Sequence, residues 1–173
     1  MDTLKELYKI GNGPSSSHTM GPQRAAERFK NENPDADSFR ATLYGSLAAT
    51  GAGHLTDYII IKTIAPKKVE IVWREDIIKD FHPNGMLLEA LDKDGNTTAQ
   101  WEVFSVGGGS LAEEGKRTTS AVKETYPLST MDEIIKWCKD NNKTLVDFAL
   151  EYEDSDIMDH INTIREAMKK SID

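Results

Sequence analysis

The apolar residues in the last third of the chain recur at helical intervals. Three sets of residues have the spacing of a helix face: Met131, Ile134, Ile135 and Cys138; then Leu145, Phe148, Ala149 and Tyr152; and finally Ile157, Ile161, Ile164 and Met168. Apolar residues three and four positions apart lie on one side of an α-helix. Thr130 and Glu133 also have the capping-box spacing that begins the first of these helices. The region from residue 127 to residue 173 is therefore predicted to be a helical tail.

The preceding 126 residues mix helical and extended patterns. Helices are expected at residues 2–8, 22–30 and 55–63, and strands at residues 38–47, 69–73, 86–92 and 97–106. Thr19 is expected to cap the second helix, and Asp94-Gly95 is a strong signal for a hairpin between the last two strands. Residues 75–81 fit either a helix or a loop. The pattern predicts an α+β domain at residues 1–126, in which helices pack on a small mixed or antiparallel sheet.

Composition removes several classes of function. The chain has 173 residues and a formal charge of −8, with 21 basic and 29 acidic residues. No basic stripe is present, which argues against a nucleic-acid partner. No apolar run approaches the length of a membrane span, and residues 1–10 are too polar for a secretory signal. The single cysteine, Cys138, excludes an internal disulfide and a thiolate metal site within this chain. A cytoplasmic location is expected.

The segment from residue 11 to residue 21 carries the densest polar chemistry. It contains three glycines, a proline, and the run Ser15, Ser16, Ser17, His18 and Thr19. Hydroxyls, a titratable imidazole and the free N–H groups of a following helix suit a small carboxylate or phosphate. Serines beside glycine and proline are also ordinary loop composition. No Walker A lysine and no Gly-x-Ser-x-Gly elbow is present, so neither a P-loop nor a serine hydrolase is predicted.

The other histidines and the cysteine have competing interpretations. His54 ends the stretch of small residues 48–54, which is expected to be a flexible loop, and it is either a general base or metal ligand or a surface or helix-capping residue. His82 in a Pro-Asn-Gly turn is expected to bond to backbone, and His160 is expected to be solvated. Cys138 on an apolar stripe is expected to be a buried thiol of the core.

Four stretches together resemble one family. Residues 9–22 (KIGNGPSSSHTMGP) resemble the entry motif of the iron–sulfur-dependent L-serine dehydratases, in their beta chain or beta domain. Residues 45–57, 82–86 (HPNGM) and 105–109 (SVGGG) are similar to three further motifs of that family, in the same order. Family members often carry lysine where this chain has Ala52. The resemblance covers essentially the whole chain.

The resemblance implies a lyase of amino-acid catabolism and gluconeogenesis. Such an enzyme removes water from L-serine, and the aminoacrylate that forms hydrolyses to pyruvate and ammonia. Its [4Fe–4S] cluster is held by a separate alpha domain, so the cofactor is expected outside this chain. In single-chain members a helix like residues 157–172 continues into that domain. The chain is therefore expected to be an N-terminal fragment or a separate beta subunit that is inactive alone, with no metal site of its own.

The resemblance also implies roles for individual residues. His54 is expected to be the general base that removes the Cα proton, and His18 is expected to be the second catalytic residue. The residues expected to bind the substrate are Ser15, Ser16, Ser17, Thr19, Asn84 and Gly108.

Two other classes of function stay open at this stage. The beta domain of this family resembles the effector-binding domain of some phosphoglycerate dehydrogenases, so the chain could be a non-catalytic module that binds serine or another small anion. It could also be a structural docking subunit. The three apolar stripes after Pro127 exceed what so small a domain can cover, which predicts an exposed apolar face and a homodimer or a contact with the alpha domain.

Overall fold

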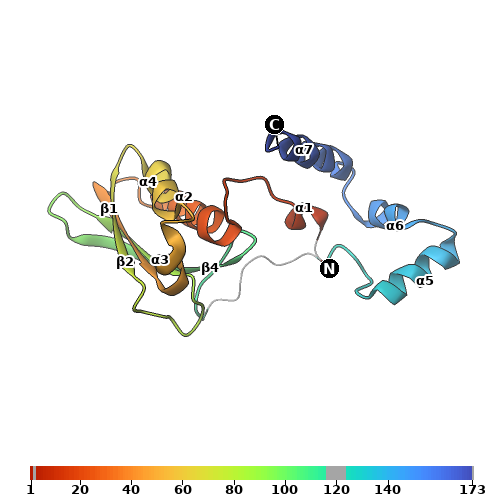
Figure 1. Cartoon of the computed structure of the whole chain (residues 1–173), viewed down its shortest axis with the longest axis horizontal. Coiled ribbons are helices and arrows are strands. Elements are labelled where there is room, and N and C mark those ends of the chain that lie inside the picture. Colours follow the sequence, from red (N-terminus) through yellow and green to blue (C-terminus); the bar gives the residue numbers. More distant parts are fainter. Residues whose placement is uncertain (2, 116–123, 173) are drawn as a thin grey trace. The chain divides into compact units, whose positions relative to one another are not determined.

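The computed structural model describes residue 1, residues 3–115 and residues 124–172. The chain divides into two compact units (Figure 1): residues 11–119 form one, and residues 1–10 together with 120–173 form the other. Residues 1–10, which the sequence pattern assigned to the α+β domain, thus group with the C-terminal helices. No helix in the described residues combines the length and apolar character needed to cross a membrane.

The larger unit is built on a five-stranded sheet with the order β2-β1-β3-β4-β5. The strands are β1 (Ser38–Tyr44), β2 (Lys68–Arg74), β3 (Gly85–Leu91), β4 (Thr97–Gly107) and β5 (Ser110–Ala112). Only the β1–β2 pair is parallel, and the other three pairs are antiparallel. This arrangement confirms the predicted α+β class and its mixed sheet.

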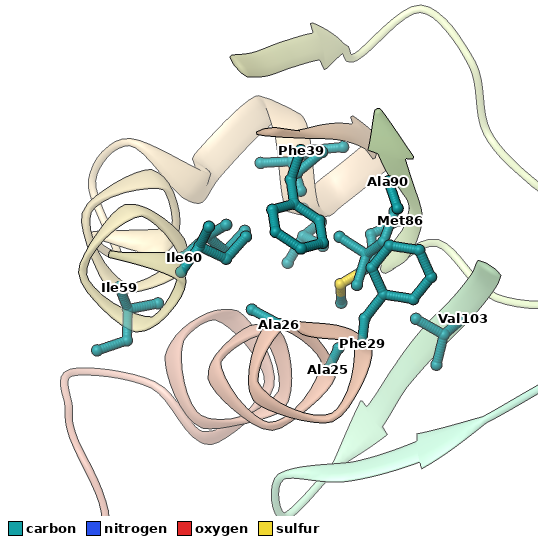
Figure 2. Packing of buried hydrophobic residues seen from close by; sticks show 14 of the residues in the cluster. Ala25, Ala26, Phe29, Phe39, Ile59, Ile60, Met86, Ala90 and Val103 are labelled. Atoms are coloured by element: carbon teal, nitrogen blue, oxygen red, sulfur yellow. The ribbon is translucent and has the colours of Figure 1, made fainter. Parts of the chain in front are cut away.

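One face of the sheet packs against helices α2 (Gly21–Glu32) and α4 (Thr56–Ile64). Figure 2 shows the core between the helices and the sheet, to which α2 contributes Phe29, α4 contributes Ile60 and β3 contributes Met86. Alternate residues of β1 point into this core because successive side chains of a strand face opposite sides. The other face is polar: Arg40 of β1 forms ion pairs with Glu70 and Glu89 on the two neighbouring strands.

The structure corrects the predicted end of the first strand. β1 ends at Tyr44, and helix α3 (Gly45–Gly51) replaces both the expected strand end and most of the expected flexible loop. Gly45 has φ +49°, a conformation that turns the chain sharply and that glycine adopts at little cost. The carbonyl of Pro83 accepts from the Ser46 N–H and so satisfies a free donor at the start of the new helix.

The predicted cap of the second helix is also wrong. A five-residue π-helical turn, η1 (Ser16–Met20), runs directly into α2, and Ser15 caps it by accepting from the His18 N–H. The helical segment therefore starts at the serine run, and Thr19 lies within it. Residues 75–81 form no helix, and the short strand β5 was not anticipated.

The smaller unit contains helices α1 (Leu4–Leu7), α5 (Met131–Asn141), α6 (Leu145–Tyr152) and α7 (Ile157–Lys170). The predicted capping box of α5 is present, and a second one at Thr144 and Asp147 begins α6. Its core gathers aromatic rings around Phe148, and Cys138 is buried there as predicted. Other apolar side chains of these helices remain exposed, as expected: Met131, Leu145, Val146, Met158 and Met168.

Candidate functional site

Two segments far apart in the sequence bring His18 and His54 together. His18 lies in η1, and His54 lies in the turn between α3 and α4. Their imidazole ring centroids are 4.8 Å apart, with the ring planes inclined by 40°. Both residues are partly exposed. The two histidines that the sequence singled out therefore form one surface site on the larger unit.

The serine run surrounds His18 with hydroxyls. The Ser17 hydroxyl lies 3.0 Å from His18 Nδ1, and the Ser15 hydroxyl lies 3.4 Å from that of Ser17. Ser16 is exposed at the start of the helical segment. The N–H groups of Ser16 and Ser17 precede the first helical hydrogen bonds, so this end carries the positive pole of a helix that continues to Glu32.

The hydrogen-bond partners constrain the tautomers of the two rings differently. His54 Nδ1 lies 2.9 Å from the carbonyl oxygen of Thr50, and a carbonyl can only accept, so Nδ1 carries the hydrogen. The lone pair of neutral His54 is then on Nε2. His18 Nε2 lies 3.4 Å from both the carbonyl oxygen and the hydroxyl of Ser46, and its Nδ1 lies 3.0 Å from the Ser17 hydroxyl. A hydroxyl can donate or accept, so these contacts are compatible with either tautomer of His18. Among the described residues, His54 Nε2 thus has no hydrogen-bond partner, whereas both nitrogens of His18 have one.

The surroundings of His18 favour the neutral form of its ring. Burial is the main cause that lowers the pKa of His18 below its usual 6.5; the hydrogen bond to the Ser46 carbonyl opposes this, and a positive charge on His54 would lower it further. A neutral imidazole can accept the Ser17 hydroxyl hydrogen, whereas an imidazolium cannot.

Thr19 and Thr56 carry hydroxyls that face the interior. Thr19 is 1% exposed and Thr56 is 0% exposed. The Thr19 hydroxyl donates to the His54 carbonyl oxygen at 2.9 Å, and the Thr56 hydroxyl donates to the His18 carbonyl oxygen at 2.6 Å. In this structure the Thr19 hydroxyl, which the resemblance assigned to the substrate, is thus used within the protein. The sequence pattern did not single out Thr56. Its position two residues after His54 is the one signal in the sequence that could have pointed to it.

Asn84 and Gly108 lie near the adjacent ends of β3 and β4. The Asn84 side chain donates to the Ser105 carbonyl at 3.3 Å, while its Oδ1 is buried with no hydrogen-bond partner among the described residues. Gly108 has φ +58° in the turn between β4 and β5, and a Cβ there would meet open space. Asn84 is connected to the histidine site through the residue before it, Pro83. The Pro83 carbonyl accepts from the Ser46 N–H, and the Ser46 carbonyl in turn lies 3.4 Å from His18 Nε2.

The remaining histidines lie outside this cluster. His82 Nδ1 accepts from the Asn84 N–H at 3.1 Å, which confirms the predicted turn residue. His160 is not simply solvated: its Nε2 lies 3.3 Å from the Tyr8 carbonyl oxygen within the smaller unit.

Comparison with known proteins identifies the family. The family model for the serine dehydratase beta chain matches residues 3–70 and 61–116. The chain belongs to the serine dehydratase beta-chain family. It is 30% identical to the L-serine dehydratase of Haemophilus influenzae, over 88% of this chain and 43% of that protein. It is 28% identical to L-serine dehydratase 2 of Escherichia coli, over 100% of this chain and 49% of that protein, and 30% identical to the L-serine dehydratase of Mycobacterium tuberculosis, over 86% and 41%. The chain thus spans less than half the length of each of these relatives.

This beta chain does not offer the ligands of an iron–sulfur cluster. Such clusters are held by several cysteine thiolates, and Cys138 is the one cysteine in the sequence, buried in α5. Among the described residues, no three His, Cys, Asp or Glu side chains lie close enough together to hold a metal ion. One cysteine falls short of the several thiolates that hold such a cluster.

Proposed function

We propose that this chain supplies the substrate-binding and base-carrying half of an L-serine dehydratase, which converts L-serine to pyruvate and ammonia. The observation that carries the proposal is the pairing of His18 and His54 beside the serine run, within a chain of the beta family. The reaction removes the Cα proton and the hydroxyl group of serine, and the resulting aminoacrylate hydrolyses.

His54 is proposed as the general base. Its Nδ1–H is held by the Thr50 carbonyl, which leaves Nε2 to accept the Cα proton. The Cα proton of an amino acid is weakly acidic, so the base must be placed close to it and must be neutral. His54 is partly exposed, so a substrate held by another part of the complete enzyme can reach it.

The serine run and His18 are proposed to hold the substrate. The free N–H groups of Ser16 and Ser17 and the positive pole of the helix favour the carboxylate. The hydroxyls of Ser15 and Ser17 form a chain of contacts to His18 that can rearrange to bind the polar groups of serine. Thr19, Asn84 and Gly108 stay predicted members of this binding site.

The complete enzyme is proposed to include an alpha domain or subunit that carries the [4Fe–4S] cluster, since such a cluster needs several cysteine thiolates and this sequence has one cysteine. The exposed apolar side chains of α5 and α6 are proposed to contact that alpha half or a second copy in a homodimer. A cytoplasmic location, amino-acid catabolism and gluconeogenesis belong to the same proposal.

Anaerobic mixing tests the division of labour. This chain alone is expected to bind no iron and to consume no serine. Addition of a cluster-loaded alpha half from a relative is expected to produce pyruvate from L-serine. Serine binding by this chain with no pyruvate from any alpha half would favour the effector-module alternative. Iron–sulfur absorbance in this purified chain would contradict the proposal.

A further inference from the structure

The hydroxyls of two buried threonines form hydrogen bonds between the segment that contains His18 and the segment that contains His54. Thr19 directly follows His18, yet its hydroxyl donates to the carbonyl of His54. Thr56 lies two residues after His54, yet its hydroxyl donates to the carbonyl of His18. The two segments thus each donate one hydrogen bond to the other. The backbone of each histidine accepts from a threonine of the opposite segment.

The His18 carbonyl lacks the donor that an α-helix would give it. In an α-helix it would accept from the N–H four residues further on, but that residue is Pro22, which has no N–H. The Thr56 hydroxyl supplies a hydrogen at 2.6 Å instead. A carbonyl that is removed from water and left without a donor costs about 1–3 kcal/mol, so this part-buried hydrogen bond favours one placement of the segment.

The His54 side has a comparable irregularity. Leu55, between His54 and α4, has φ +58°, a left-handed conformation that is costly for a branched residue. The Thr19 hydroxyl holds the His54 carbonyl immediately before this turn, and Thr19 also accepts from the Ser15 N–H at 3.3 Å. One hydroxyl thus connects the start of the serine run to the backbone of His54.

We propose that the hydroxyls of Thr19 and Thr56 are positioning groups that set the distance and relative orientation of the His18 and His54 rings. Neither residue is proposed to touch the substrate. The hydroxyl group itself is required, because a valine would fill the same space and yet remove the hydrogen bond to a part-buried carbonyl. We call this pair of threonine hydrogen bonds the clamp. Its expected effect on catalysis rests on the proposed function, whereas its expected effect on the geometry of the two rings does not.

The wild-type chain offers a first test without any substitution. Hydroxyl protons that are buried and hydrogen-bonded exchange slowly enough with water to be seen by NMR. We expect resonances for the hydroxyls of Thr19 and Thr56, with nuclear Overhauser contacts to the residues whose carbonyls they bind. Exchange of both hydroxyl protons at the rate of exposed threonines would overturn the proposal.

Substitution separates the hydroxyl from the packing. Thr56→Val and Thr19→Val remove the donor, while Thr56→Ser and Thr19→Ser keep it. Thr42→Val is the matched control, because Thr42 is a buried threonine of β1 in the same unit and outside both histidine segments. The readouts are the Overhauser contacts between the two imidazole rings and the ¹⁵N shifts that report each ring's tautomer.

Loss of the ring-to-ring contacts in either valine variant, with recovery in the serine variant and no change in Thr42→Val, would support the clamp. Unchanged contacts and tautomers in a folded valine variant would refute it. Should one valine variant fail to fold, the other decides, together with the hydroxyl exchange in the wild type.

Activity gives a second, separable readout. In enzyme reconstituted with an alpha half, Thr56→Val is expected to lower kcat by about 10²-fold, the effect of misplacing a catalytic group by about 1 Å, with a smaller change in KM. Thr56→Ser should restore most of the rate. Absence of activity in the reconstituted wild type would count against the proposed function, while the NMR contacts would still decide the clamp.

Discussion

Gly21 lies directly against Ser105, and the contact leaves no room for a side chain. A Cβ on Gly21 would be 2.9 Å from the Ser105 Cβ and closer still to its hydroxyl oxygen. Gly21 begins α2 immediately after η1, whereas Ser105 is a fully buried residue of β4. Because Gly21 has no side chain, the segment that carries His18 can lie close to the sheet at this point.

Gly21→Ala is therefore expected to destabilise the larger unit by about 1–3 kcal/mol, the usual cost of overpacking a core. Denaturant unfolding measures the change. Gly53→Ala is the control, because a Cβ there would make only an ordinary contact, 3.5 Å from the Thr50 carbonyl oxygen. Addition of Ser105→Gly to Gly21→Ala should recover part of the loss. Equal stability of Gly21→Ala and wild type would show that the contact relaxes freely.

His54→Ala is expected to lower kcat of the reconstituted enzyme by about 10²–10⁴-fold, the usual contribution of a positioned base. Serine should still bind, because other groups hold its carboxylate and hydroxyl. Replacement of His18 should weaken binding as well as turnover, since Ser17 and His18 lie together in the serine run. His160→Ala is the control, because His160 lies in the smaller unit and its ring contacts the Tyr8 carbonyl there. A near-normal kcat in His54→Ala, with only a raised KM, would place the base elsewhere.

The lowered pKa of His18 makes stability depend on pH. Burial, the largest cause, disfavours the imidazolium in the folded chain, so the unfolded chain binds more protons below pH 6.5. This contribution to stability is fully present above about pH 6.5 and is lost as the pH falls from there toward the folded pKa. The ring-proton titration of His18 by NMR should have a midpoint below 6.5. His18→Gln should flatten the stability profile in this window, and a His18 midpoint above 6.5 would contradict the expected burial effect.

Glu153 is expected to hold the N-terminal segment in the smaller unit. Its carboxylate accepts from the Thr3 hydroxyl, the Leu4 N–H and the Tyr126 hydroxyl. Glu153→Gln should therefore speed amide hydrogen exchange at Leu4 by roughly tenfold or more, since hydrogen bonds to charged groups contribute about 1.5–3 kcal/mol. Glu151→Gln is the control, because Glu151 lies near the end of α6, which Glu153 follows directly, and pairs with Lys143. Equal exchange at Leu4 in both variants would show that the segment is held by other contacts.

The pKa values of this cluster give the sign of its pH dependence. Burial by itself would raise the pKa of Glu153, but the hydrogen bonds from Thr3, Tyr126 and Leu4 outweigh it and lower the pKa below 4.5. The stabilisation is thus present above about pH 4.5 and is lost as the pH falls through the folded pKa. Burial, followed by the bond to Glu153, raises the pKa of Tyr126. Tyr126→Phe should accordingly move the acid loss of Leu4 protection toward higher pH.

Local chemistry in the sequence was enough for most elements of the fold. The apolar spacing and the Thr130–Glu133 box predicted α5, because both depend only on residues within one or two helical turns. Asp94-Gly95 predicted the β3–β4 hairpin for the same reason. The local pattern did not predict the start of α3 at Gly45. There the first turn depends on a distant group, because the carbonyl of Pro83 accepts from the Ser46 N–H.

In the candidate site, too, the sequence predicted what depends on residue type and not what depends on distant contacts. The serine run, His18 and His54 could be singled out from the sequence because their chemistry is carried by residue type. Their mutual placement could not, since it depends on hydrogen bonds between segments more than thirty residues apart, from Thr19 to the His54 carbonyl and from Thr56 to the His18 carbonyl. His18 Nε2 also lies against the backbone carbonyl of Ser46, which belongs to α3. Backbone carbonyls are present at every residue, so only the tertiary structure decides which of them faces an imidazole.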